Sequence, residues 1–210
     1  KMLRIKDIKI KKDFSKEELI KYICEKSKIK LTDVRDFRIY KKSIDARNKA
    51  DIFYVYTVDI LVEDEKLYNK FEHIDLEDEA KIDVKINRKS LLRPIIVGAG
   101  PAGLFAALTL AQSGIKPIVL EQGKSVDERQ KDVELFWKEG KLNTLSNVQF
   151  GEGGAGTFSD GKLTTGVNDP LCKKVIREFY NFGAPEQILY TSKPHIGTDN
   201  LINIVRNMRE

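Results

Sequence analysis

Apolar and polar residues alternate along four short segments in the first ninety residues, at 2–10, 34–44, 51–63 and 81–86. Isoleucine, valine, phenylalanine and tyrosine supply many of the apolar positions, and charged residues fill many of the positions between them. A period of two is the pattern of a strand with one buried face. The polar connection at 45–49 favours antiparallel pairing of the second and third segments. We therefore expect these segments to be the strands of one sheet.

The segment after the first strand changes to a helical period. Ser15 and Glu18 have the spacing of a capping box, in which each side chain accepts a hydrogen bond from a backbone N–H at the start of a helix. A weaker helical stretch covers residues 65–71. The order β-α-β-β-α-β predicts a small ferredoxin-like α+β domain over residues 1–90.

A different pattern begins after this domain. An apolar run at 93–97 leads directly into Gly98, Gly100 and Gly103, a helix of small residues follows, and a second apolar run ends in Glu121. A buried strand, a glycine turn, a helix and a second strand, in this order, are the parts of a parallel β-α-β unit. The sequence therefore predicts an α/β fold with a Rossmann-like unit.

Each glycine meets a separate requirement of a dinucleotide cradle. Gly98 permits the tight turn, Gly100 lets the backbone approach a pyrophosphate, and Gly103 allows the helix to pack closely on the strand. The helix N-terminus would direct N–H groups at the phosphates, and Glu121 would accept hydrogen bonds from ribose hydroxyls. FAD and NAD share the adenosine-diphosphate end, so these residues alone do not separate the two. The predicted contacts are Gly98, Ala99, Gly100, Pro101, Ala102, Gly103, Glu121 and Gln122.

A second glycine segment, which we define as residues 146–166, favours another backbone cradle over a flexible loop. Its glycines would let main-chain N–H groups reach a pyrophosphate or a flavin ring, and its hydroxyl side chains would add donors. The candidate contacts here are Gly153, Gly154, Ala155, Gly156, Thr157 and Ser159.

The stretch GAGPAGLFAALTLAQSG…IVLEQ resembles the N-terminal FAD-binding fingerprint of the two-dinucleotide-binding flavoproteins, the glutathione-reductase-like superfamily. Together with VELFWKEGKLN, the second glycine segment and PHIGTDNL, it is similar to a bacterial family of uncharacterised FAD-dependent dehydrogenases. That family carries a small domain ahead of its FAD fingerprint, which fits residues 1–90. The resemblance implies FAD as the cofactor, NAD(P)H as a candidate electron donor, and an incomplete, N-terminal part of an FAD-binding domain over residues 91–210.

The resemblance also implies roles for charged residues outside the glycine turns. In related flavoproteins a basic residue on the helix after the acid contacts the cofactor, so Arg129 is a candidate phosphate ligand, with a solvated helix face as the alternative. Asp160 and Lys162 would lie near the isoalloxazine ring. His195 is a candidate acid–base group or substrate contact, and a hydrogen-bonded loop histidine is the alternative. The catalytic residues and the substrate stay unassigned.

Composition limits the remaining choices. Cys24 and Cys172 lie far apart and form neither a C-x₄-C nor a C-x-x-C pair, which argues against a thiol–disulfide reductase. They give no disulfide framework, so we expect a cytoplasmic protein. No apolar run approaches the roughly 20 residues that span a bilayer, and no metal-ligand cluster is evident.

Charge is distributed unevenly. Residues 1–49 contain 17 basic and 8 acidic residues, whereas residues 50–93 contain 7 basic and 11 acidic residues. The basic stretch motivates an alternative function, a non-catalytic dinucleotide-binding protein whose first domain recruits a nucleic acid or protein. The reversal of charge and the lack of an aromatic ribonucleoprotein motif argue against nucleic acid as the partner. The leading hypothesis is therefore an FAD-dependent oxidoreductase.

Overall fold

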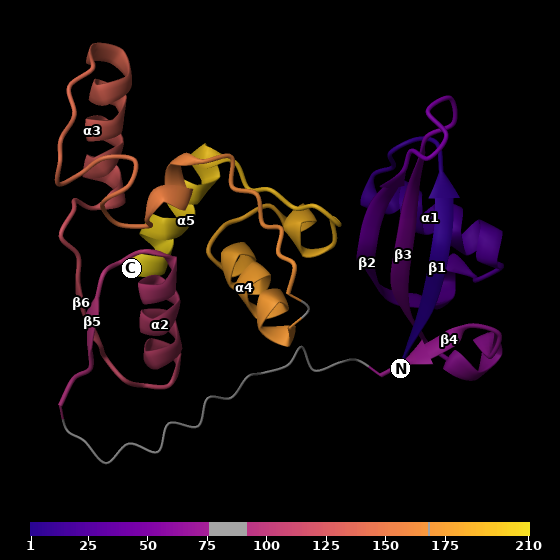
Figure 1. Cartoon of the computed structure of the whole chain (residues 1–210). Helices are drawn as coiled ribbons and strands as arrows, with labels where there is room; N and C mark the ends of the chain where they lie inside the picture. The colour runs from indigo at the N-terminus through magenta and orange to yellow at the C-terminus, as the bar shows by residue number, and fades with distance from the viewer. Residues whose placement is uncertain (76–91, 168) are drawn as a thin grey trace. The chain divides into compact units, whose positions relative to one another are not determined.

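The computed structural model describes residues 1–75, 92–167 and 169–210. The chain divides into two units (Figure 1). The first unit comprises Lys1–Ala80 with Leu189–Pro194, and the second comprises Lys81–Ile188 with His195–Glu210. The strand expected at 81–86 lies outside the described residues.

The first unit is built on a four-stranded antiparallel sheet with the strand order β2-β3-β1-β4. Its strands are β1 (Met2–Ile10), β2 (Val34–Asp45), β3 (Phe53–Val62) and β4 (Glu72–Ile74). The helix expected at 65–71 is wrong in type: a 3₁₀ turn, Glu65–Tyr68, stands there instead. Nine residues separate β3 from β4, and they form one short turn that places Tyr68 in the core. The ferredoxin-like assignment stays a prediction.

Helix α1 (Lys16–Ser27) begins at the expected capping box. The Ser15 hydroxyl accepts from the Glu18 N–H at 3.2 Å, and the Glu18 carboxylate accepts from the Ser15 N–H at 2.9 Å. The helix buries Leu19, Ile23 and Cys24 in a core shared with alternate residues of β3. Those β3 residues are Tyr56, Val58, Ile60 and Val62.

Asp59 lies between core residues of β3, and its side chain therefore points to the other face of the sheet. This carboxylate is fully buried and accepts hydrogen bonds from Arg4 at 2.7 and 2.9 Å and from Arg38 at 3.0 Å. The Arg4 guanidinium also stacks over the Tyr40 ring, 3.6 Å from its centroid. Charge on this face is thus compensated inside the unit.

The segment Leu189–Pro194 belongs to the first unit because it pairs with the edge of β2. The Lys42 N–H donates to the Tyr190 carbonyl at 2.7 Å, and the Ser192 N–H donates to the Lys42 carbonyl at 3.0 Å. These bonds satisfy backbone groups that an edge strand would otherwise leave open.

The second unit contains the predicted parallel β-α-β arrangement. Strand β5 (Ile95–Val97), helix α2 (Pro101–Gln112) and strand β6 (Ile118–Leu120) follow one another, and β5 pairs with β6 in parallel register. Pro101 opens α2, where its missing N–H is no loss. The mixed α/β character is as expected, whereas the Rossmann-like assignment stays a prediction.

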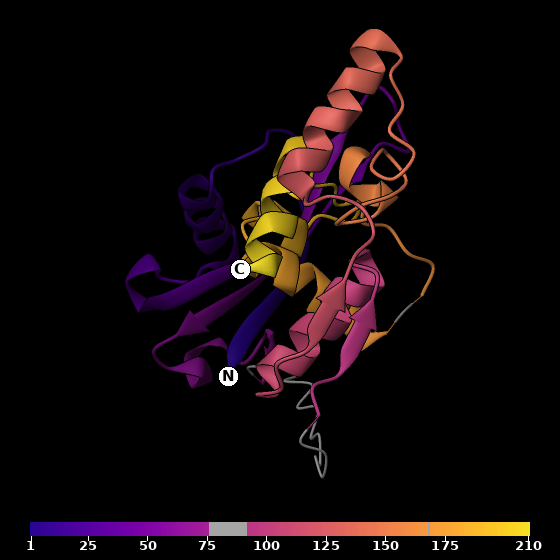
Figure 2. The same ribbon diagram turned by 90° about the vertical axis from the view of Figure 1, so that its left-hand side faces the viewer.

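Further helices surround this β-α-β arrangement. They are α3 (Val126–Glu139), α4 (Pro170–Asn181) and α5 (Thr198–Arg209), with 3₁₀ turns at Ala155–Phe158 and Glu186–Leu189. Helix α5, drawn yellow in Figure 2, packs Ile202 and Val205 against Ala99, Leu104 and Val126. This small core fixes the first glycine turn, residues 98–103, against the far end of the chain.

Within the described part of the chain, no helix has both the length and the apolar character needed to cross a membrane. The same residues hold no group of three or more side chains suited to binding a metal ion.

Candidate functional site

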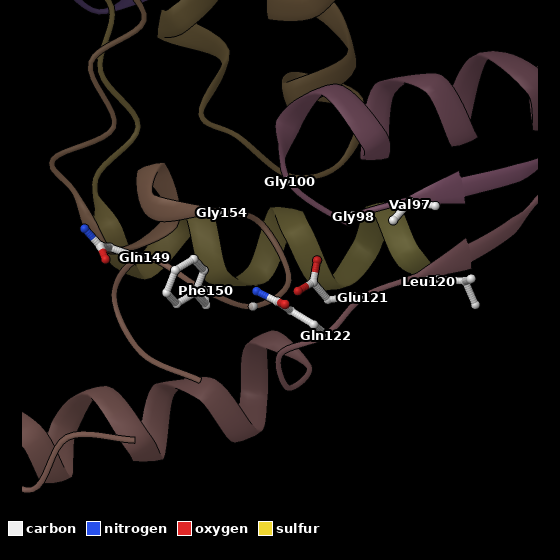
Figure 3. Close-up of a pocket in the computed structure, with 10 residues that line it drawn as sticks. Val97, Gly98, Gly100, Leu120, Glu121, Gln122, Gln149, Phe150 and Gly154 are labelled. Carbon is white, nitrogen blue, oxygen red and sulfur yellow. The ribbon is translucent and has the colours of Figure 1, made fainter. Parts of the chain in front are cut away.

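A cavity of about 260 Å³ opens where strands β5 and β6 end (Figure 3). The two strands are parallel, so their carboxyl ends meet at the same edge, where ligands bind in open α/β sheets. The first glycine turn forms one wall, and residues 149–151 with Gly154 form another. Five predicted residues line the cavity, namely Gly98, Gly100, Glu121, Gln122 and Gly154.

The first glycine turn has the geometry expected from its spacing. Gly98 has a positive φ of 96°, which favours glycine, and its N–H donates to the Leu120 carbonyl at 2.6 Å. A Cβ built on Gly103 would lie 1.9 Å from the Gly98 carbonyl oxygen, so the helix approaches the turn too closely for any side chain. A Cβ on Gly100 would meet nothing within 4 Å, because this residue faces the cavity.

Glu121 is held in place by the backbone on both sides of it. One carboxylate oxygen accepts from the Ala99 N–H at 2.7 Å, and the other accepts from the Gly123 N–H at 2.9 Å. These two hydrogen bonds were not predicted from the sequence motif. A carboxylate has about four acceptor positions, so the group can also accept hydrogen bonds from two ligand hydroxyls.

The second glycine segment lies directly beside the first glycine turn. The Gly153 N–H donates to the Ala99 carbonyl at 2.8 Å. A Cβ on Gly154 would lie 3.0 Å from Cδ of Pro101, and both Gly153 and Gly154 have positive φ angles. The two glycine-rich stretches, far apart in the sequence, therefore form one continuous backbone surface.

Among the residues that the structure describes, Arg129 is the largest fully buried side chain, at 0% exposure. The alternative of a solvated helix face is therefore wrong. Its guanidinium stacks on the Phe158 ring, 4.8 Å from the centroid, and donates to backbone carbonyls of the second glycine segment. A direct contact with phosphate stays a prediction. The acceptors are the carbonyl oxygens of Asn147 (2.7 Å), Val148 (2.8 Å), Glu152 (2.7 Å) and Gly154 (2.9 Å).

The segment between Gly123 and Gly151, which contains α3, begins and ends at the same place beside the site. A Cβ on Gly123 would lie 2.4 Å from Cα of Gly151, so the backbones before and after the segment touch. Glu152 closes this place, because its carboxylate accepts from the Val126 N–H and from Arg209 of α5, both at 2.7 Å. The N-terminus of α3 is thereby capped from outside the helix.

Asp127, in the first turn of α3, also pairs with α5. Its carboxylate accepts from Arg206, with Nε at 2.7 Å, and from Arg209 at 3.3 Å. The hydrogen bond from Arg206 is the largest cause that lowers the pKa of Asp127 below its ordinary value.

Asp160 and Lys162 form an exposed ion pair at 2.7 Å. The hydrogen bond between them lowers the pKa of Asp160 and raises that of Lys162. Lys162 also makes an isolated antiparallel bridge with His195. None of the three lines the cavity, and their contact with a flavin or substrate stays a prediction.

Twelve of the predicted residues lie outside the cavity lining. Thr157 is 2% exposed and packs against Gly153, and the Ser159 hydroxyl donates to the Gly156 carbonyl at 2.7 Å. The predicted residues outside the cavity lining are Ala99, Pro101, Ala102, Gly103, Arg129, Gly153, Ala155, Gly156, Thr157, Ser159, Asp160 and Lys162.

Sequence reasoning missed half of the residues that line the cavity. Its lining also includes Val97, Leu120, Gln149, Phe150 and Gly151. Val97 and Leu120 could have been found from their place at the ends of the two predicted strands. Phe150 has no comparable signal, although it directly precedes the glycines of the second glycine segment.

Two family models match parts of this chain. A family model described as "FAD binding domain" matches residues 93–157, a range that contains both walls of the cavity. A second model, "Domain of unknown function (DUF8436)", matches residues 2–61. The match over residues 93–157 supports FAD as the cofactor.

A protein from Clostridium beijerinckii, described only as "Uncharacterized protein", is 47% identical to this chain over 213 residues. The aligned region covers 99% of this chain and 40% of that relative. The chain thus spans about two fifths of the length of the curated relative it matches.

Proposed function

We propose that the protein is an FAD-dependent oxidoreductase of the dehydrogenase type, within the glutathione-reductase-like superfamily. One observation carries the proposal: hydrogen bonds connect Ala99 to both Glu121 and Gly153 at the end of two parallel strands. All three residues lie inside the region matched by the FAD-binding model. In such enzymes the flavin supplies the hydride or electron transfer, and the protein supplies position and electrostatics.

Each part of the cavity has a role in this proposal. Glu121 accepts hydrogen bonds from the adenosine ribose, the backbone around Gly100 and Gly154 contacts the pyrophosphate, and the start of α2 adds N–H donors. What supports this assignment is that Glu121 is already anchored by two N–H groups and that Gly100 faces open space. The β-α-β arrangement is then the Rossmann-like core of an FAD domain.

The first unit is assigned a ferredoxin-like fold on its strand order. Its basic residues do not favour the alternative function of nucleic-acid recruitment. Lys9, Lys11 and Lys42 each pair with an aspartate of the same unit, at 2.6–3.0 Å. We propose NAD(P)H as the electron donor and the cytoplasm as the location.

The test uses the full-length protein. Gentle purification followed by a visible absorption spectrum should show the flavin bands, and added FAD should restore them to stripped protein. Bound flavin that is reduced by NADH or NADPH, with turnover, would support the oxidoreductase. Protein that takes up no FAD after stripping and reconstitution would contradict the proposal.

A further inference from the structure

Arg129 is unusual because its buried guanidinium donates hydrogen bonds only to the backbone of one segment. Burying a charge is costly unless hydrogen bonds compensate it. Here four of the five guanidinium N–H donors are used on carbonyls of residues 147–154. The side chain therefore organises that segment, which supplies two glycines, Gly151 and Gly154, to the cavity wall.

The carbonyls held by Arg129 also determine where the neighbouring N–H groups point. In a trans peptide the C=O and the following N–H face opposite sides. The peptide between Glu152 and Gly153 accepts from Arg129 at one end and donates to the Ala99 carbonyl at the other. Arg129 is thereby linked through one peptide unit to the first glycine turn.

The Gly154 carbonyl determines where the following N–H group points. Arg129 holds the Gly154 carbonyl at 2.9 Å, so the Ala155 N–H points away from the guanidinium. Gly154 itself lines the cavity. The Gly153 and Gly154 N–H groups donate to the carbonyls of Ala99 and Gly151, so the Ala155 N–H is the donor of this turn that a ligand anion can take.

The charge of Arg129 is set by its burial and by two nearby carboxylates. Burial lowers the pKa of Arg129, and the carboxylates of Glu121 and Glu152 raise it. Because arginine stays protonated in proteins, a positive charge lies directly behind the glycine wall. A Cβ on Gly151 would lie 2.6 Å from Cδ of Arg129, which shows how thin this wall is.

We infer that Arg129 is a positioning residue for the pyrophosphate of the dinucleotide. It holds the carbonyls of Glu152 and Gly154 so that the Gly153 N–H serves the first glycine turn and the Ala155 N–H serves the ligand, and it does not itself touch phosphate. This inference rests on the proposed function, because it requires a pyrophosphate in the cavity.

The test compares Arg129→Lys and Arg129→Met with wild type in the full-length protein. Lysine keeps the charge but cannot span four carbonyls with its single ammonium, and methionine removes both charge and donors. Arg206→Lys is the matched control, since Arg206 donates to Asp127 and Asn203 and not to the second glycine segment. FAD affinity is measured by flavin fluorescence, well below the unfolding temperature of each apoprotein.

We expect Arg129→Lys to weaken FAD binding by about 10-fold to 100-fold, the range for lost hydrogen bonds to a charged group. The ³¹P resonances of the bound pyrophosphate should also shift in this variant, a change that a general loss of stability would not cause. Arg206→Lys should leave both readouts as in wild type. In a crystal structure of the FAD complex, the four carbonyl bonds should persist and no Arg129 nitrogen should reach a phosphate oxygen.

The outcomes separate the two proposals. Wild-type protein that does not bind FAD would remove the proposed function itself. Wild-type binding with unchanged affinity and ³¹P shifts in Arg129→Lys would overturn the inference, even if that variant unfolds at a lower temperature. A guanidinium bonded to phosphate in the complex would overturn it as well. If Arg129→Met does not fold, the FAD affinity and ³¹P shifts of Arg129→Lys alone test the inference.

Discussion

The Glu121 carboxylate accepts a hydrogen bond from the Ala99 N–H at 2.7 Å, so the end of β6 holds the first glycine turn. The same side chain that would bind the ribose thus also shapes the phosphate-binding turn. A substitution at Glu121 should therefore affect stability and ligand affinity together.

Replacing Glu121 with alanine should weaken FAD binding by about 1.5–3 kcal/mol, the range for hydrogen bonds to a charged group. It should also lower the thermal unfolding midpoint of the apoprotein. Glu121→Gln keeps one acceptor oxygen but turns an NH₂ group toward the second N–H, so it should be intermediate. Isothermal titration and calorimetry measure both effects. Glu134→Ala, on the exposed pair with Lys138, is the control, and equal affinity in all variants would refute the role of Glu121.

The first glycine turn offers a pair of substitutions with opposite expectations. Gly100→Ala should fold normally, because φ is −71° and the Cβ meets nothing within 4 Å, yet it should prevent the close approach of a pyrophosphate. Gly103→Ala should destabilise the unit, because its Cβ would overlap the Gly98 carbonyl oxygen. Circular dichroism and FAD occupancy separate the two effects. Full FAD occupancy in Gly100→Ala would contradict the cradle assignment.

Phe150 is 43% exposed and lines the cavity. We predict that its ring packs on the adenosine part of the ligand. Base–aromatic stacking is worth about 1–3 kcal/mol by alanine substitution, so Phe150→Ala should weaken FAD by this amount while Phe150→Tyr keeps the affinity. Competition with FMN, which lacks adenosine, provides the contrast: a loss equal for FMN and FAD would place the ring elsewhere.

Asp127 should contribute to stability above about pH 4 and lose this contribution in stronger acid. The hydrogen bond from Arg206 lowers its folded pKa below the unfolded value of about 3.9. The contribution is therefore complete above the unfolded pKa and is lost as the pH falls through the folded pKa. Asp127→Asn should cost about 1 kcal/mol or less at pH 7, because the pair is partly exposed. Unfolding midpoints from pH 7 to pH 2 should then fall less steeply below pH 4 in the variant than in wild type.

The buried ion cluster of the first unit provides a stability test independent of FAD. Asp59→Ala would leave Arg4, whose side chain is 13% exposed, without its carboxylate. Breaking a buried pair costs about 3–5 kcal/mol, measurable by urea unfolding. Asp51→Ala, which removes an exposed pair with Lys11, should stay within about 0.5 kcal/mol of wild type. Equal losses in the two variants would show that burial does not strengthen the Asp59 cluster.

Local patterns were enough to predict the elements that depend on neighbouring residues. The capping box of Ser15 and Glu18 and the strand–turn–helix around Gly98 both lie within short stretches, where spacing determines geometry. The helix expected at 65–71 was wrong, because a short turn at Glu65–Tyr68 leads there into β4, whose pairing with the start of β1 is a long-range contact.

The support of the site could not be predicted in the same way. Arg129 reaches carbonyls 18–25 residues away in the sequence, and the Gly153 bond to Ala99 joins the two glycine stretches. A charged residue on a polar helix is normally exposed, so nothing in DERQKD indicates complete burial. Such contacts arise only when the tertiary fold brings both stretches together.

Because Gly123 contacts Gly151, α3 and the loop that follows it form a side branch, a segment that leaves the rest of the unit and returns to it at the same place. The free-energy cost of closing a loop rises only slowly with its length, by about 0.6 kcal/mol for each doubling. At the exposed tip, residues 135–142, insertions or deletions should therefore cost little, provided that the two glycines, Arg129 and the buried Val133 stay in place. Length differences among relatives should accumulate at the tip of this branch, and a short affinity tag placed there offers a way to label the protein without disturbing its dinucleotide site.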